Sequence, residues 1–242
     1  MNHLDVLVLP RDPTGKLPPL NPVLLHDETE AVLVDCGCTG FLPLVESAAK
    51  AKGVDLARLT RVFITHHDHD HMGALAALKR TYPRAQVLAS AEDAPYIQGE
   101  RKFLRLVQAE ALFDSLPEDK KIESLRLQQT VAAVEPVRVD ATVADGQVFP
   151  WCGGIEVVAT PGHMPGHISL YARESRTLIA GDALTVVDGR LAPANPRFTL
   201  DPAQARASMR KLLDYDIIRL VCYHGGVVEG DIRQALRDAL EA

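Results

Sequence analysis

The chain has 242 residues, of which 47% are hydrophobic and 24% charged, and its formal net charge is −6 at pH 7. This composition is typical of a folded globular protein, and the acidic balance gives no electrostatic reason to expect a nucleic-acid or membrane partner. No stretch approaches the ~18 uninterrupted apolar residues of a membrane span, and residues 1–10 lack the pattern of a secretory signal. We therefore expect a cytoplasmic protein.

Short apolar runs alternate with turns and helical stretches in the first part of the chain. Strands are expected at Val6–Leu9, Val23–His26, Ala31–Asp35, Val62–Thr65 and Gln86–Ala89, and helices at Phe41–Lys52 and Met72–Tyr82. Gly53 and Pro83 follow these helices and are residue types that end helices. The alternation of strands and helices indicates an α/β protein.

Residues from about 91 to 129 have a different pattern. Apolar residues recur at three- and four-residue steps between Phe103 and Leu116, with charged residues between them, which predicts amphipathic helix. The apolar stripe has two interpretations. We favour packing against the core; the alternative is a lid or a homodimer surface, in which Phe103, Leu106 and Phe113 shape specificity.

A second β-rich block follows this insert. Strands are expected at Val137–Val139, Gln147–Phe149, Ile155–Ala159, Ile168–Ala172, Thr177–Ala180 and Ile217–Tyr223, and helices at Pro202–Leu213 and near Asp231–Glu241. The chain is thus predicted to form one domain, 1–242, in which a helical insert separates two halves that both contain strands and helices.

The histidines are strongly clustered. The chain has nine, and all except His3 and His26 lie in three short stretches. In the run from Thr65 to Gly73, six consecutive imidazoles and carboxylates stand between a predicted strand and a helix. Crowding these groups together is unfavourable without a cation, whereas neutral imidazole and carboxylate bind zinc, iron or manganese. The run therefore predicts a metal site rather than a solvated turn.

Further candidate ligands follow predicted strands. His163 and His167 lie in a glycine-containing turn, Asp182 follows the strand that ends at Ala180, and His224 follows the strand that ends at Tyr223. Each alone is compatible with an ordinary turn. Because α/β proteins commonly place their active sites where strands meet loops, the set together supports the metal centre.

These motifs resemble those of the metallo-β-lactamase-fold hydrolase superfamily, over essentially the whole chain. The pattern T-H-x-H-x-D-H-x-G resembles Thr65–Gly73, T-P-G-H-S-x-G-H resembles Thr160–His167, G-D resembles Gly181-Asp182, and I-D-T-G resembles the element ending in Asp35-Cys36-Gly37. The resemblance implies a four-layer αββα sandwich of two sheets with helices outside, and a dinuclear metal site at one edge of the sheets.

The resemblance also implies roles for individual residues. The first metal would be held by His66, Asp68 and His163, the second by Asp70, His71 and His224, with Asp182 bridging the two. His67 and His69 fall on positions that are not ligands. Asp35 and His167 would orient the ligands.

Asp68 departs from the pattern, because most relatives have a histidine there. A shifted register through His67, His69 and His71 would displace Asp70, and Thr65 and Gly73 favour the unshifted register. Two divalent ions, three carboxylates and a hydroxide give a neutral centre, which would make bound water less acidic and favour harder metals. Zinc is our first choice, with iron or manganese as alternatives, since the flavodiiron branch carries a carboxylate here and binds iron.

The activity implied by the resemblance is metal-dependent hydrolysis of a small molecule. A hydroxide in the dinuclear site would attack a lactone, ester or thioester, and Asp70 would orient it and pass a proton to the leaving group. Size and insert resemble the quorum-signal lactonases, although Thr185 stands where that branch has tyrosine. The short segment after His224 leaves no room for the extra helical domain of hydroxyacylglutathione hydrolases. The alternatives are an iron-dependent oxidoreductase acting on oxygen or sulfur substrates, and a phosphodiesterase.

Overall fold

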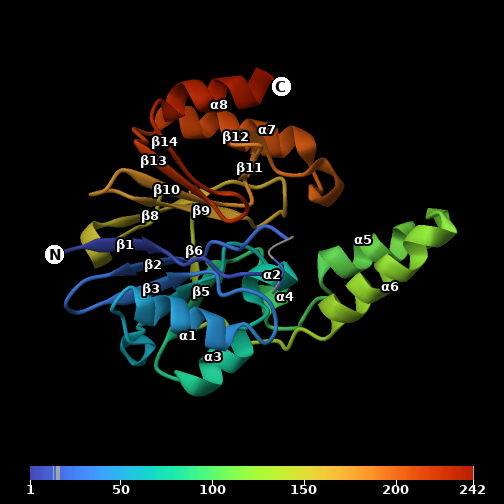
Figure 1. Cartoon of the computed structure of the whole chain (residues 1–242), viewed down its shortest axis with the longest axis horizontal. Coiled ribbons are helices and arrows are strands. Elements are labelled where there is room, and N and C mark those ends of the chain that lie inside the picture. The colour runs from blue at the N-terminus through green and yellow to red at the C-terminus, as the bar shows by residue number, and fades with distance from the viewer. Residues whose placement is uncertain (13, 15–16, 242) are drawn as a thin grey trace.

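Two facing β-sheets form the centre of the molecule in the computed structural model, which describes residues 1–12, 14 and 17–241 (Figure 1). The strand orders are β1-β2-β3-β4-β5-β6 and β14-β13-β10-β9-β8-β7. Helices α1 (Leu42–Ala51) and α3 (Leu75–Thr81) cover the outer face of the first sheet. Helices α7 (Pro202–Lys211) and α8 (Ile232–Glu241) cover the second, so the predicted αββα sandwich is confirmed.

The first sheet brings the ends of several strands to one edge. Its strands are β1 (His3–Val6), β2 (Val23–His26), β3 (Ala31–Val34), β4 (Arg61–Phe63), β5 (Gln86–Ser90) and β6 (Ala141–Val143). The pairs β3–β4, β4–β5 and β5–β6 are parallel. Parallel neighbours end at the same edge of a sheet, so the loops that follow β3, β4 and β5 start side by side.

The second sheet is mainly antiparallel. It contains β7 (Val148–Phe149), β8 (Ile155–Ala159), β9 (Ile168–Ala172), β10 (Thr177–Gly181), β13 (Arg219–Cys222) and β14 (Gly226–Glu229). The pair β10–β13 is parallel, which places the loops after β10 and β13 together. A separate hairpin, β11 (Leu184–Val187) and β12 (Arg190–Pro193), follows β10 directly.

Both faces of the central strands are buried, as continuous apolar runs predict. In β2, Val23 and Leu25 face the second sheet, whereas Leu24 packs in the cluster beneath α1 and α3. This alternation follows from the two-residue period of a strand. A third cluster, which includes Met209 and Leu236, fills the space between the second sheet, α7 and α8. The sandwich is therefore a rigid support for the loops at its edge.

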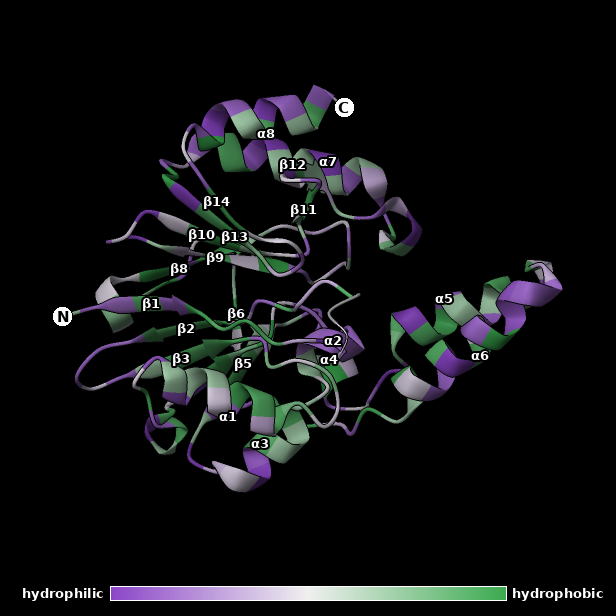
Figure 2. Ribbon diagram, viewed as in Figure 1, coloured by the Kyte–Doolittle hydropathy of each residue, from purple (hydrophilic) through white to green (hydrophobic). Residues whose placement is uncertain are grey.

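The insert forms two helices that extend away from the sandwich (Figure 1). After the short α2 (His69–Met72) and α4 (Ala94–Ile97), helix α5 (Leu104–Leu112) runs through the turn Phe113–Ser115 into α6 (Glu118–Ala132). We call residues 104–132 the arm. Helix is confirmed here, but burial is limited to the two ends. Phe103, just before the arm, contacts the core cluster, and Leu106 and Val131 are buried, whereas Val107, Leu112, Ile122 and Leu125 are exposed. Figure 2 shows the resulting mixture of apolar and polar residues along the arm.

Some predicted elements differ from the structure. Val137–Val139 is extended and buried but forms no strand, because Val137 N–H donates to the Ile97 carbonyl and Val139 N–H to the Gln98 side chain. The first strand ends at Val6, and the helix expected at Met72–Tyr82 is divided between α2 and α3. Strands β6, β11, β12 and β14 were not predicted. Pro13 and Gly15, part of a loop rich in proline and glycine, lie outside the described residues. Among the described residues, no helix has the length and apolar character needed to cross a membrane.

Candidate metal centre

The candidate ligands lie in loops at one edge of the two sheets. The run from His66 to His71 follows β4, His163 follows β8, Asp182 follows β10 and His224 follows β13. Because parallel strands end side by side, residues far apart in the sequence meet here. The structure brings all seven predicted ligands together.

These side chains form three overlapping groups whose ligand atoms lie within 4.8 Å of one another: His66, Asp68 and His163; His66, His71 and Asp182; and Asp70, His71 and His224. We call the first of these the first group and the last the second group. Asp182 contacts both: its Oδ1 lies 3.3 Å from His71 Nε2, and its Oδ2 lies 3.6 Å from His163 Nε2 and 3.4 Å from His224 Nε2. Asp182 therefore lies where a bridging ligand would be required.

The spacing of the ligand atoms suits a metal ion. Two ligands bound tetrahedrally at zinc distances of ~2.0–2.1 Å are about 3.3 Å apart. Asp68 Oδ2 lies 3.1 Å from His163 Nε2 and 3.4 Å from His66 Nε2. Asp70 Oδ2 lies 3.3 Å from His224 Nε2. Both groups are therefore compatible with a divalent ion.

Unpartnered buried atoms give a second test. Three ligand atoms, His66 Nε2, His71 Nε2 and Asp182 Oδ1, are among the buried side-chain atoms of the described residues that form no hydrogen bond, although the last two lie 3.3 Å apart. Buried polar atoms in folded proteins are rarely left without one, and all three atoms belong to the groups just described. The donor set thus fits a metal centre.

Asp35 holds the first motif in place. Its carboxylate accepts hydrogen bonds from Thr65 N–H (2.9 Å), Thr65 Oγ1 (2.8 Å) and His71 Nδ1 (2.8 Å). With Nδ1 engaged in this way, His71 presents Nε2 to Asp182. Burial lowers the pKa of His71, but the charges of Asp182 and Asp35 more than compensate and raise it well above the usual value. Asp35 therefore lies where the predicted orienting role requires it.

His167 supports the loop that carries Asp182. Its Nδ1 lies 2.9 Å from Thr160 Oγ1, and its Nε2 accepts a hydrogen bond of 2.9 Å from the Asp182 backbone N–H. Burial, and then the positive charges of His66 and His163, lower the pKa of His167 well below the usual value. A neutral ring is what an Nε2 acceptor requires.

The other two histidines of the motif face elsewhere. His67 is buried; its Nδ1 lies 3.0 Å from Asp93 Oδ2 and its ring stacks on Tyr96 at 4.3 Å. His69 lines the cavity above the centre. Neither belongs to a metal-binding group among the described residues, so the geometry follows the unshifted register.

The three carboxylates are strongly acidic. Burial raises the pKa of Asp70, but the hydrogen bond with His224 and the charges of the neighbouring histidines lower it below the usual range. Burial also raises the pKa values of Asp68 and Asp182. Hydrogen bonds and charges of the neighbouring histidines, and the charge of Arg105 for Asp68, more than compensate and lower both pKa values well below the usual value. Burial lowers the pKa of His224, but Asp182 and Asp70 more than compensate and raise it to about 10. The raised pKa values of His71 and His224 favour their protonated forms beside Asp70 and Asp182, and a divalent ion would displace those protons.

Arg105, in the arm, is the site residue that the sequence analysis missed. It is 3% exposed; its Nε donates to Asp68 Oδ1 at 3.1 Å and its Nη2 to Asp68 Oδ2 at 2.6 Å. A single arginine in an amphipathic helix gives no sequence signal for this contact. Because its charge offsets that of Asp68, the preference for harder metals inferred from Asp68 loses its electrostatic basis.

A cavity of about 830 Å³ opens above the centre. Its floor carries the carboxylates and histidines, and its walls are largely apolar, with Leu127 from the arm and Leu184, Val187, Pro193 and Phe198 from or near the β11–β12 hairpin. Thr185 also lines it and donates a hydrogen bond of 3.0 Å to the His224 carbonyl. This volume is in the range of small-molecule sites. From the arm, Arg105 and Leu127 line the cavity, whereas Phe103, Leu106 and Phe113, which the alternative interpretation of the insert would have shape specificity, do not.

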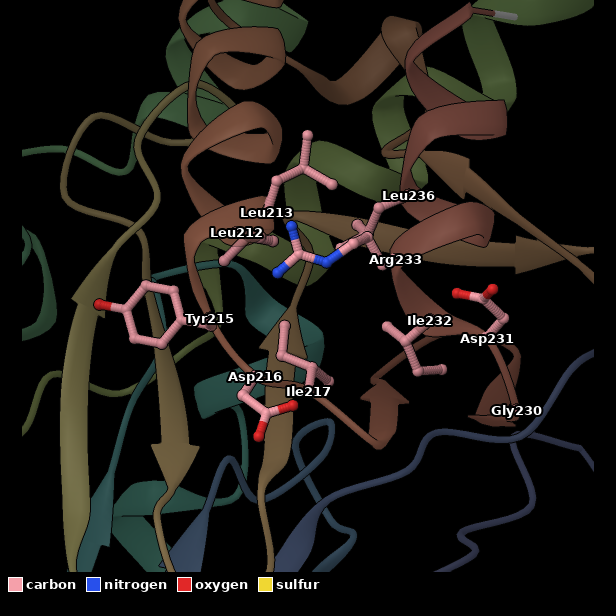
Figure 3. Close-up of a pocket in the computed structure, with 10 residues that line it drawn as sticks. All are labelled: Leu212, Leu213, Tyr215, Asp216, Ile217, Gly230, Asp231, Ile232, Arg233 and Leu236. Carbon is pink, nitrogen blue, oxygen red and sulfur yellow. The ribbon is translucent and has the colours of Figure 1, made fainter.

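A smaller cavity of about 260 Å³ lies between the turn at Leu212–Asp214 and α8 (Figure 3). Its ten lining residues include no histidine or cysteine, and one of its charged groups, Asp216, is paired with Arg176. It offers none of the chemistry of the metal centre.

The αββα sandwich, with histidine and carboxylate ligands in the loops at its edge, defines a metallo-hydrolase. The family model of the Metallo-beta-lactamase superfamily matches residues 17–224, and the chain belongs to this family. Among curated proteins, it is 28% identical over 212 residues to the "Probable metallo-hydrolase YflN" of Bacillus subtilis (strain 168), covering 80% of this chain and 75% of that one. It is also 30% identical over 165 residues to a hydroxyacylglutathione hydrolase of Synechococcus sp. (strain JA-2-3B'a(2-13)), covering 66% of this chain and 47% of that one.

A further relative is the uncharacterized protein YobT of Bacillus subtilis (strain 168), which is 28% identical over 171 residues. The match covers 71% of this chain and 64% of that protein. Among solved structures, a metallo-beta-lactamase family protein from Thermus thermophilus superposes with a TM-score of 0.75 at 24% identity, covering 98% of this chain and 78% of that one. This likeness supports the fold.

Proposed function

We propose that the chain hydrolyses a small acyl substrate, a lactone, ester or thioester, with divalent metal ions held by the first and second groups. The observation that carries the proposal is that Asp182 contacts histidines of both groups at the floor of the cavity. A divalent ion bound there would supply a strongly nucleophilic hydroxide near neutral pH and polarise the substrate carbonyl. Zinc is the ion that we propose.

The chain's own residues supply orientation and proton transfer. Asp70 Oδ2 faces His224 Nε2 at 3.3 Å, and Oδ1 lies 3.8 Å from His69 Nδ1, a neighbour that also lines the cavity. In this arrangement Asp70 Oδ1 is the atom to accept a proton from the attacking water and return it to the leaving oxygen or sulfur. We therefore assign the catalytic role to Asp70.

The cavity walls favour an acyl substrate with an apolar part. Leu184, Val187 and Phe198 provide apolar surface beside the charged floor, so a hydrocarbon chain gains binding energy when it leaves water there. Several relatives are named hydroxyacylglutathione hydrolases, a name that describes hydrolysis of an acyl group carried by glutathione, and this also supports acyl chemistry.

The test is a substrate screen with metal-free and zinc-loaded protein. The panel contains lactones, aryl esters, acyl thioesters and bis(p-nitrophenyl) phosphate. We expect zinc-dependent turnover of at least one acyl class, lowered about 100-fold or more in Asp70→Ala. Asp238→Ala, which removes an exposed carboxylate from α8, is the matched control and should retain activity.

Two results would overturn this proposal. Turnover confined to the phosphodiester would make the protein a phosphodiesterase. Stoichiometric iron in protein purified without added metal, together with oxygen consumption, would make it an oxidoreductase.

A further inference from the structure

Arg105 connects the arm to the metal centre. It is the second residue of α5, and all three of its guanidinium nitrogens have partners: Nε and Nη2 donate to Asp68, and Nη1 donates to Gln108 Oε1 at 2.6 Å. Its guanidinium carbon also lies 5.2 Å from the centre of the Phe198 ring, which lines the cavity. The side chain is therefore held in one place.

The guanidinium engages two of the three ligand atoms of the first group. Nη2 lies 2.6 Å from Asp68 Oδ2 and 3.3 Å from His163 Nε2. Arginine only donates hydrogen bonds, so the bond to Asp68 Oδ2 takes a lone pair that a metal ion would use. The contact with His163 Nε2 places the guanidinium charge beside a second ligand atom of the first group. His66 Nε2, the third ligand atom, has no contact with Arg105 among the described residues and lies 3.4 Å from Asp68 Oδ2.

The second group differs in its charge. Asp70 and Asp182 contribute two carboxylates near His71 and His224, and the described residues place no arginine or lysine in hydrogen-bond or ion-pair contact with either carboxylate. Asp182 faces both groups, but Asp68, the one carboxylate that belongs to the first group alone, is already paired with Arg105. A divalent cation is thus attracted by two carboxylates at the second group, whereas at the first the guanidinium charge opposes it.

We propose that Arg105 acts as a built-in cation at the first group, so that the chain holds one divalent ion tightly at the second group and binds a second ion only weakly. The inference rests on the proposed function, because it takes both groups to be metal sites. It makes Arg105 a positioning residue for Asp68 and places occupancy of the first group under the control of the arm.

The attachment of the arm supports this control. Close to Arg105, the Leu104 N–H points to His67 Nε2 at 3.4 Å, and farther along α5, Gln108 Nε2 donates to the Arg197 carbonyl at 3.4 Å. Beyond these contacts α5 and α6 pack on each other and extend away from the sandwich (Figure 1). A displacement of α5 from the sandwich would withdraw the guanidinium and expose the whole first group to a metal ion.

Metal titration of the full chain tests this proposal without any substrate. Metal-free wild type is titrated with Zn²⁺ and, separately, with Co²⁺, and bound metal is measured by competition with a chromophoric chelator and by Co²⁺ absorption. We expect one tight ion and a second that binds at least about 100-fold more weakly. In Arg105→Met the second ion should bind about 100-fold more tightly than in wild type.

Controls keep the result interpretable. Arg126→Met removes a positive charge from the exposed surface of α6 and should leave both binding steps unchanged. Arg105→Gln, which is also neutral but polar, should reproduce the tighter second step and serves if the Met variant does not fold.

Three outcomes contradict the proposal. Two ions bound with equal affinity by wild type would show that Arg105 does not oppose the first ion. Weaker second binding in the Arg105 variants would show that Arg105 only supports Asp68. Absence of any tight ion would refute the metal-dependent hydrolase as well, which the other two outcomes would leave intact.

Discussion

Replacing Asp35 with Asn removes one negative charge from beneath the metal centre and leaves the shape of the side chain almost unchanged. Asp35 has a φ of 60°, in the left-handed region, and asparagine tolerates that conformation well. Backbone strain is therefore the same in both proteins. Any difference between them comes from the hydrogen bonds and the charge.

The magnitude follows from the three donors that face Asp35. Its two oxygens accept from Thr65 N–H, Thr65 Oγ1 and His71 Nδ1. An amide offers one oxygen, so in either orientation its NH₂ group faces a buried donor. One unsatisfied buried donor costs about 1–3 kcal/mol, and the lost charge-assisted bond to His71 adds about 1 kcal/mol. We expect the metal-free protein to lose about 3 kcal/mol of stability.

Loss of this hydrogen bond should also weaken metal binding, by about 10- to 100-fold. Urea unfolding of the metal-free protein and zinc competition with a chelator measure the two effects. Asp140→Asn is the matched control, because Asp140 also accepts hydrogen bonds, from Lys79 and Val87 N–H, but lies outside the metal-binding groups. An Asp35→Asn variant that matched wild type in both urea midpoint and zinc affinity would refute the assigned role of Asp35.

Three further predictions concern the support and walls of the centre. In urea unfolding, Gly73→Ala should cost about 3 kcal/mol of stability, because a Cβ would lie 2.3 Å from Thr39 N and 2.4 Å from His69 O. The control Gly53→Ala, whose Cβ would have no such neighbours, should cost about 1 kcal/mol. Burial raises the pKa of Asp140, but the hydrogen bonds from Lys79 and Val87 N–H more than compensate and hold it below the usual value. Its stabilisation is therefore present above the usual aspartate pKa and lost as pH falls through the lowered pKa of the folded protein, so the deficit of Asp140→Asn, about 1 kcal/mol at pH 7, should shrink in urea titrations as the pH is lowered below that usual value. A constant deficit would contradict this sign. Leu127→Trp should narrow the cavity and lower kcat/KM for long acyl chains about tenfold relative to acetyl substrates, whereas Leu125→Trp, on the exposed surface of the same helix, should not.

Strong local patterns made most of the fold predictable. Ile155–Ala159 and Ile168–Ala172 are strands with the predicted bounds, because buried apolar runs bounded by turns leave few alternatives. Val137–Val139 has the same kind of pattern but finds its hydrogen-bond partners in the α4 region rather than in a sheet. The residue pattern predicts that this segment is buried, whereas tertiary contacts determine which groups its backbone hydrogen-bonds to.

The candidate metal ligands were predictable because they lie in short motifs of unusual composition. The contact between Asp68 and Arg105 was not, since it joins residues from different elements and Arg105 stands in an ordinary amphipathic helix. The same holds for the cavity wall. Leu184 and Val187 line it because the β11–β12 hairpin folds over the centre, which depends on the packing of that hairpin rather than on a motif.

One measurement tests the central claim, that this centre hydrolyses acyl substrates with bound metal, most directly. Metal-free wild type is titrated with zinc while bound metal and the initial rate of hydrolysis of the best acyl substrate are recorded on the same samples. We predict no turnover without metal and a rate that rises as zinc binds. Turnover independent of metal, or full zinc binding without hydrolysis of any acyl substrate, would contradict the account.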